Sequence, residues 1–78
     1  MRYIMFEDFS GKEVPIIFPA RIGFVEMREQ MPYATVVSAG YIQLRSGEIF
    51  CHGEAKELGA VSKETDNAVV TEYLTDIS

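Results

Sequence analysis

The only thiol and the only imidazole in the chain belong to adjacent residues, Cys51 and His52. A thiol within hydrogen-bond reach of an imidazole is the nucleophile and base pair of cysteine-dependent hydrolases. Residues 48–54 have the composition of a β-strand, however, and adjacent residues on a strand point to opposite faces. We therefore expect no Cys–His dyad: Cys51 is predicted to be a small core residue, and His52 to lie on the outer face of the sheet.

Other catalytic and metal sites are not indicated by the remaining residues. One Cys and one His are too few for the usual zinc sites of a single chain. Ser10 and Ser38 lack the strand–turn–helix setting of an activated serine, and the glycines match neither common nucleotide-binding spacing. The carboxylates are scattered, and none lies in an apolar run that would raise its pKa. We predict no catalytic residues, no metal and no cofactor, and keep a small enzyme only as the third alternative.

Length and charge exclude several classes of protein. The chain has 78 residues, 47% of them hydrophobic, which predicts a single folded domain over residues 1–78. A net charge of −5 disfavours binding to a nucleic-acid backbone. No apolar run is long enough for a membrane span, and acidic residues follow the first apolar residues too soon for a signal peptide. With a single Cys, these features predict a cytoplasmic protein.

The pattern of apolar and turn-forming residues predicts six elements in the order ββαββα. Strands are expected at residues 2–6, 13–18, 34–45 and 48–54, and helices at residues 21–31 and 63–75. Pro15 lacks an N–H group, so the second strand should be an edge strand, or Pro15 should lie at an unpaired position. Ser62 is expected to cap the second helix. The predicted fold class is α+β, a small antiparallel sheet with the helices packed on one face.

The second hairpin is specific enough to predict its register. If Ser46 and Gly47 form the turn, the next pairs are Arg45–Glu48, Leu44–Ile49, Gln43–Phe50, Ile42–Cys51 and Tyr41–His52. Alternation then divides the side chains between a core face and a mixed face that meets solvent or a partner. The predicted core consists of Ile42, Leu44, Ile49, Cys51, Val70, Leu74 and Ile77, joined by Ile4, Phe6, Ile16 and Phe18.

Two groups of residues are candidates for binding. The first combines the mixed face of the hairpin with nearby cations: Tyr41, Arg45, Phe50, His52, Lys56 and Lys63. The second is an acidic surface on the last helix: Glu64, Glu72 and Asp76. A solvated face is the plainer interpretation of the acidic residues, and a basic partner is the functional one. A chain this small without disulfides also favours self-association, most simply as a dimer.

Several short motifs resemble a family of small uncharacterised proteins of tailed phages and prophages. They are Val14-Pro15-Ile16-Ile17-Phe18-Pro19, Val36-Val37-Ser38-Ala39-Gly40-Tyr41-Ile42, Cys51-x-Gly53 and Leu58-Gly59-x-x-Ser62-x-x-x-Asp66-x-x-x-Val70. The resemblance implies a context, the cytoplasm of a host cell, rather than a chemistry. Small acidic phage proteins of this kind are often accessory factors that block host defence, either by binding a defence protein, as anti-CRISPR proteins do, or by sequestering a nucleotide signal.

The sequence therefore predicts a non-enzymatic accessory protein of phage type that acts by binding. Direct binding to a host defence protein is favoured, because a net charge of −5 disfavours phosphate ligands. The alternative is a sponge for a nucleotide signal, which would have to gather Arg45, Lys56 and Lys63 at a subunit interface beside an aromatic ring.

Overall fold

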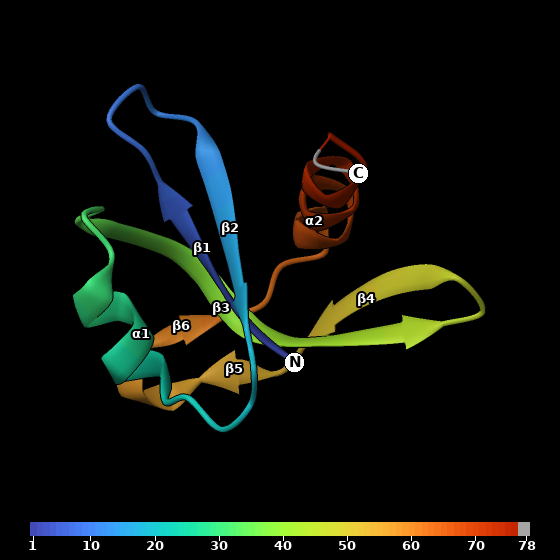
Figure 1. The fold of residues 1–78 in the computed structure, drawn as a ribbon, viewed down its shortest axis with the longest axis horizontal. Helices are drawn as coiled ribbons and strands as arrows, with labels where there is room; N and C mark the ends of the chain where they lie inside the picture. The colour runs from blue at the N-terminus through green and yellow to red at the C-terminus, as the bar shows by residue number, and fades with distance from the viewer. Residues whose placement is uncertain (77–78) are drawn as a thin grey trace.

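A computed structural model describes residues 1–76 of the chain. These residues form a four-stranded antiparallel sheet, a separate two-stranded sheet, a short 3-10 helix and two α-helices (Figure 1), which confirms the predicted α+β class. The elements are β1 (Arg2–Glu7), β2 (Glu13–Phe18), α1 (Phe24–Gln30), β3 (Thr35–Arg45), β4 (Glu48–His52), β5 (Glu54–Ala55), η1 (Lys56–Leu58), β6 (Ala60–Val61) and α2 (Thr65–Asp76). The six predicted elements are all present, and the connector after β4 adds β5, η1 and β6.

The larger sheet has the strand order β2-β1-β3-β4. The strand that contains Pro15 is an edge strand, as its missing N–H group predicted. β3 is long enough to pair with β1 through its first half and with β4 through its second half. The register between β1 and β3 shifts between Met5, which pairs with Ser38, and Phe6, which pairs with Val36. The five predicted pairs between β3 and β4 are confirmed.

The two helices lie on opposite faces of the sheet, whereas the sequence analysis placed them on one face. Ile4 and Phe6 pack on the side of α1, together with Phe24. Tyr3 and Met5 pack on the side of α2, where Val70 is fully buried. The physical reason lies in β1, whose four central residues are apolar without alternation. A strand of this kind must be covered on both faces, so each face receives one helix.

The predicted core is partly correct. Ile4, Phe6, Phe18 and Val70 are buried, while Ile16, Ile42, Ile49, Cys51 and Leu74 are half-buried. Leu44 was predicted to be buried but is 69% exposed, because the outer end of the β3–β4 hairpin extends past the surface that α2 covers. Ile77 lies outside the described residues. The sequence analysis also missed the fully buried residues Tyr3, Met5 and Phe24.

The start of α2 also differs from the prediction. The side-chain hydrogen bond at this end comes from Asp66, whose Oδ2 accepts the backbone N–H of Lys63 at 2.9 Å. The backbone N–H of Ser62 donates to the carbonyl of Gly53 at 3.0 Å, so Ser62 belongs to the connector. The predicted cap is therefore not formed: within residues 1–76 the side-chain hydrogen bond at this helix start is made by Asp66 and not by Ser62.

Candidate binding surface

The hairpin formed by the second half of β3 and by β4 extends away from the rest of the molecule (Figure 1). We call residues 42–50 the arm. Its turn places Ser46 at φ 51° and Gly47 at φ 81°, the backbone conformation of the predicted two-residue turn. The arm carries two of the six predicted binding residues, Arg45 and Phe50. The confirmed register sends both to one face of the sheet and sends Ile42 and Ile49 to the other.

At the base of the arm, Tyr41 is part of the interior rather than a free binding residue. Its ring meets the edge of Phe24 at 5.8 Å between centroids and stacks on the ring of His52 at 6.0 Å. The guanidinium of Arg2 lies near both rings: its Cζ atom is 4.8 Å from the centroid of the Phe24 ring and 5.8 Å from that of the Tyr41 ring. A Cβ atom on Gly53 would lie 2.9 Å from Tyr41, so the absence of a side chain there makes room for the ring.

His52 and Cys51 lie on opposite faces, as predicted. His52 is exposed and stacks on Tyr41 on the α1 side. Cys51 is half-buried and packs with Val70 on the α2 side. The chain therefore separates its thiol from its imidazole by the thickness of the sheet, and the two cannot act as a nucleophile and base pair.

The three cations of the predicted binding group are not brought together. Arg45 places its guanidinium 5.6 Å from the ring of Phe50 on the arm. Lys56 lies in η1, which packs near α1, and Lys63 lies in the turn before α2. The single chain thus keeps Arg45 and Phe50 as a pair and leaves Lys56 and Lys63 on other segments.

The other face of the arm is apolar and runs out from the core into solvent. Ile42 and Ile49 pack against the cluster of Tyr3, Met5 and Val70 beneath α2. The next residue outward on this face, Leu44, has no such cover and is 69% exposed. An apolar face that continues from the core into solvent is typical of a surface that a partner covers.

Two acidic residues lie near this face, because Glu48 and Glu72 line a hollow together with Ile49. Glu64 and Glu72 are exposed at the beginning and in the second half of the α2 region, and Glu48 is exposed at the start of β4. The side chain of Asp76, the third predicted acidic residue, lies outside the described part of the chain. Glu48 and Glu72 therefore border the arm, and a positively charged partner would meet them there.

A buried polar cluster joins α2 to the sheet, and the sequence analysis did not find it. Asp66 is 1% exposed, and its Oδ2 accepts the hydroxyl of Tyr3 at 2.5 Å. Burial, followed by the nearby Asp66 carboxylate, raises the pKa of the Cys51 thiol to about 11. Burial and the hydrogen bond to Asp66 likewise raise the pKa of Tyr3 above its usual range. These groups are held in their protonated forms, which suits a structural contact rather than a reactive thiol.

One signal in the sequence pointed to this cluster. Asp66 stands three residues after Lys63, the spacing at which a carboxylate reaches back to the backbone N–H at a helix start. Nothing in that spacing shows that the same carboxylate would be buried, because burial depends on Tyr3, which lies 63 residues earlier in the chain.

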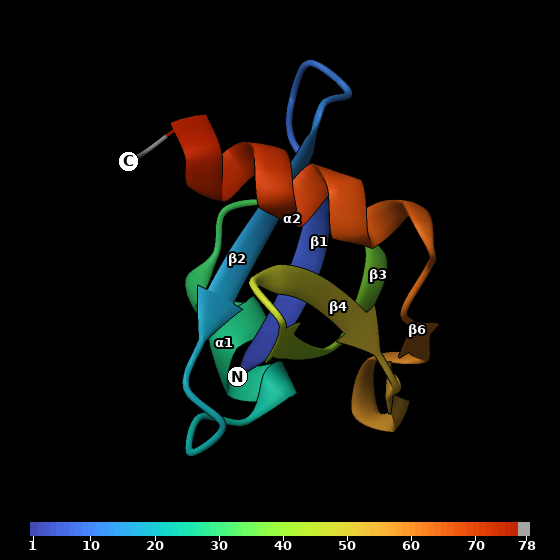
Figure 2. The same ribbon diagram turned by 90° about the vertical axis from the view of Figure 1, so that its right-hand side faces the viewer.

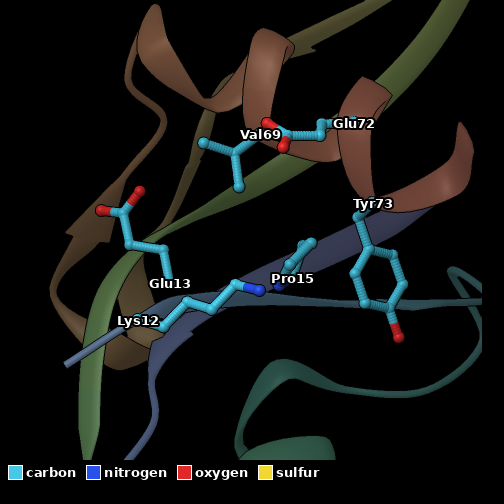
Figure 3. A pocket seen from close by; sticks show the side chains of 6 residues that line it. All are labelled: Lys12, Glu13, Pro15, Val69, Glu72 and Tyr73. Carbon is cyan, nitrogen blue, oxygen red and sulfur yellow. The ribbon is translucent and has the colours of Figure 1, made fainter. Parts of the chain in front are cut away.

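A small hollow of about 260 Å³ lies between β2 and α2 (Figure 3). Pro15 forms its apolar floor, and Val69 and Tyr73 contribute from the helix. Lys12, Glu13 and Glu72 line the same hollow. One ammonium and two carboxylates around so small a space do not single out a ligand.

Comparison with known proteins adds no relative. Neither a protein-family model, nor a curated protein, nor a solved structure matches this chain. Among residues 1–76, none of the helices has both the length and the apolar character needed to cross a membrane. Any statement about function therefore depends on the surface of this chain itself.

Proposed function

We propose that this chain acts by binding a protein partner through the arm, without catalysing a reaction. The single observation that carries the proposal is the exposure of Leu44, the outermost residue of an apolar face whose inner residues, Ile42 and Ile49, pack against the core. Protein interfaces combine an apolar centre with a polar rim, and here Glu48 and Glu72 supply acidic groups beside the apolar residues. The biological role that fits the sequence motifs is that of a phage-type accessory protein that antagonises a host defence protein.

The alternative is a nucleotide sponge, which needs a binding site that one chain does not form by itself. Phosphate groups need converging cations, yet Arg45, Lys56 and Lys63 lie on three separate segments. A sponge would therefore require a second copy of the chain to complete each site. Dimer formation stays a prediction. The ring of Tyr41 is not free for such a contact, because Phe24 and Arg2 of the same chain already pack on it.

A plaque assay with a matched pair of variants tests the proposal. Isogenic bacterial strains, each with one defence system, are challenged with a sensitive phage in the presence and absence of the protein. Leu44→Lys places a positive charge on the arm, and Val61→Lys places the same charge on β6, where the wild-type side chain is 56% exposed. Both changes leave the core intact, so melting temperatures should stay close to that of the wild type.

We expect the wild type and Val61→Lys to restore plaques in at least one strain, and Leu44→Lys to lose this activity. Equal activity of the two variants would contradict a binding role for the arm. A parallel thermal-shift measurement with cyclic and linear nucleotides tests the nucleotide sponge, since a bound ligand raises the melting temperature. A clear rise with one nucleotide would favour the sponge over the protein binder.

A further inference from the structure

The outer edge of β4 presents backbone groups that the sheet does not use. β4 is the last strand in the order of the sheet. The backbone N–H of Cys51 donates to Oδ1 of Asn67 at 2.7 Å, so this group points away from β3 and toward α2. Its strand partner Ile42 donates its own N–H in the opposite direction, to the carbonyl of Met1 at 2.8 Å. The Ile42–Cys51 pair is therefore not joined by ladder hydrogen bonds.

Backbone groups alternate along an antiparallel strand, so Ile49 must be oriented like Cys51. Its N–H and C=O groups point to the outer edge of β4. Within residues 1–76, no hydrogen bond to these two groups of Ile49 is formed. A strand edge with unpaired N–H and C=O groups is a template for another extended chain.

A hollow of about 540 Å³ lies along this edge, between β4 and α2. Figure 2 shows β4 running alongside α2. One wall is the edge of β4, and the other is the helix. The lining residues are Gly47, Glu48, Ile49, Phe50, Asn67, Ala68, Thr71 and Glu72. We call this hollow the β4–α2 groove. Its volume lies within the range of roughly 300–1,000 Å³ that is usual for ligand sites.

The residues of α2 shape this groove for an extended chain. Asn67 closes one end, because its side-chain oxygen accepts the N–H of Cys51 as the carbonyl of a neighbouring strand would. Ala68 follows with a small, exposed side chain, which leaves space opposite Ile49. The hydroxyl of Thr71 donates to the carbonyl of Asn67 at 2.7 Å and so is turned back to its own helix. The side chain of Asn67 thus pairs with the edge of β4 at Cys51, and the backbone groups of Ile49 are left for another chain.

We propose that the β4–α2 groove receives an extended, basic segment of the partner protein, which adds to β4 as a further strand. This inference rests on the proposed function and names the chemistry of the partner. Addition of a strand to a sheet edge is a general mode of peptide recognition. The added residue opposite Ile49 would point toward Ala68 on the α2 side and should be apolar. Its two neighbours would point to the other face of the sheet, where Glu48 lies, and should be Lys or Arg.

Charge argues against a second copy of this chain as the occupant. Pairing two β4 edges around a two-fold axis would bring Glu48 and Glu72 of both copies to one seam. Like charges across a strand pair are destabilising. A basic segment meets the same carboxylates with the opposite sign, and residues 40–78 carry a net charge of −4.

Selection from a displayed library of random octapeptides tests this inference with a defined probe. The library is selected on the wild type and, in parallel, on Ala68→Arg, which fills the groove from an exposed position and should not disturb folding. One selected peptide is then synthesised and titrated against Ile49→Pro and Ile49→Ala. Both variants lose the Ile49 side chain, but only Pro removes the outward N–H, which β3 does not use.

We expect the wild type to select peptides with alternating apolar and basic residues, and Ala68→Arg to lose binding at least tenfold. Ile49→Pro should bind about three- to tenfold more weakly than Ile49→Ala, as expected for the loss of one backbone hydrogen bond. The bound peptide should also slow hydrogen exchange of the Ile49 amide. The inference is overturned if selected peptides are acidic, if they bind Ala68→Arg as well as the wild type, or if the Ile49 amide exchanges at an unchanged rate.

Two further outcomes separate this inference from the proposed function. If the Ile49 amide is already protected in a free dimer that Ala68→Arg dissociates, the occupant is a second copy, and the basic segment is ruled out. If the plaque assay depends on Leu44 while Ala68→Arg stays fully active, the proposed function stands and the groove is not its site. Loss of activity in both variants, together with peptide binding as expected, supports both.

Discussion

Replacing Tyr3 by Phe removes one hydroxyl group from the interior and keeps the ring. Tyr3 is fully buried, and its hydroxyl donates to Oδ2 of Asp66, a carboxylate that is 1% exposed. Oδ1 of the same carboxylate is buried and has no hydrogen-bond partner within residues 1–76. After the substitution, the backbone N–H of Lys63 would be the remaining donor to Asp66. A buried charge would thus lose one of two donors.

The cost follows from this geometry. Hydrogen bonds to charged groups contribute about 1.5–3 kcal/mol to stability, and packing is unchanged because the ring stays in place. A domain of 78 residues has a total stability of roughly 4–12 kcal/mol, so Tyr3→Phe should remove a substantial part of it. For a domain of this size, the melting temperature should fall by roughly 6–24 °C.

Urea denaturation followed by circular dichroism measures this cost, and a double-mutant cycle assigns it. In an Asp66→Ala background the Tyr3 hydroxyl has lost its acceptor, so Tyr3→Phe should be neutral or stabilising there. A cost below about 0.5 kcal/mol in the wild-type background would refute the reasoning. The same loss in both backgrounds would show that the hydroxyl acts through something other than Asp66.

Three further predictions concern other parts of the fold. Gly40→Ala should destabilise by about 1–3 kcal/mol in urea denaturation, because its Cβ would lie 2.4 Å from the carbonyl oxygen of His52; Gly23→Ala, with open space around it, is the control and should cost far less. Ser62→Ala should cost less than about 0.5 kcal/mol, because Asp66 makes the capping contact; a cost of 1 kcal/mol or more would return that role to Ser62. The folded chain raises the pKa of Cys51, so its contribution to stability is complete below about pH 9 and is lost as the pH rises to about 11. Denaturation midpoints measured across this range should fall less steeply in Cys51→Ala than in the wild type.

Much of the fold could be predicted from short stretches of the sequence. The turn at Ser46 and Gly47 fixes the register of β3 and β4, because each residue along a hairpin follows from its turn. That register separates Cys51 from His52. Pro15 marks an edge strand for a similarly local reason, its missing N–H group.

Part of the candidate binding surface could be predicted from the sequence, and part is visible only in the structure. Alternation along the arm places Arg45 and Phe50 on one face, and the structure keeps them together. The structure does not bring Lys56 and Lys63 to this pair, because their positions depend on how the connector between β4 and α2 folds. The exposure of Leu44 could not be predicted from alternation alone, since a core face is buried only as far as another element covers it.

The sequence by itself determined the four strands of the larger sheet and the two α-helices, how the second hairpin pairs, and that the chain is acidic. These properties depend on neighbours along the chain, such as turn residues and the period of apolar side chains. Only the tertiary structure decided that the helices cover opposite faces, that Asp66 is buried against Tyr3, and that a groove opens between β4 and α2. Each of these joins residues distant in sequence, and such contacts depend on how the β-sheet and helices pack, which periodicity does not encode.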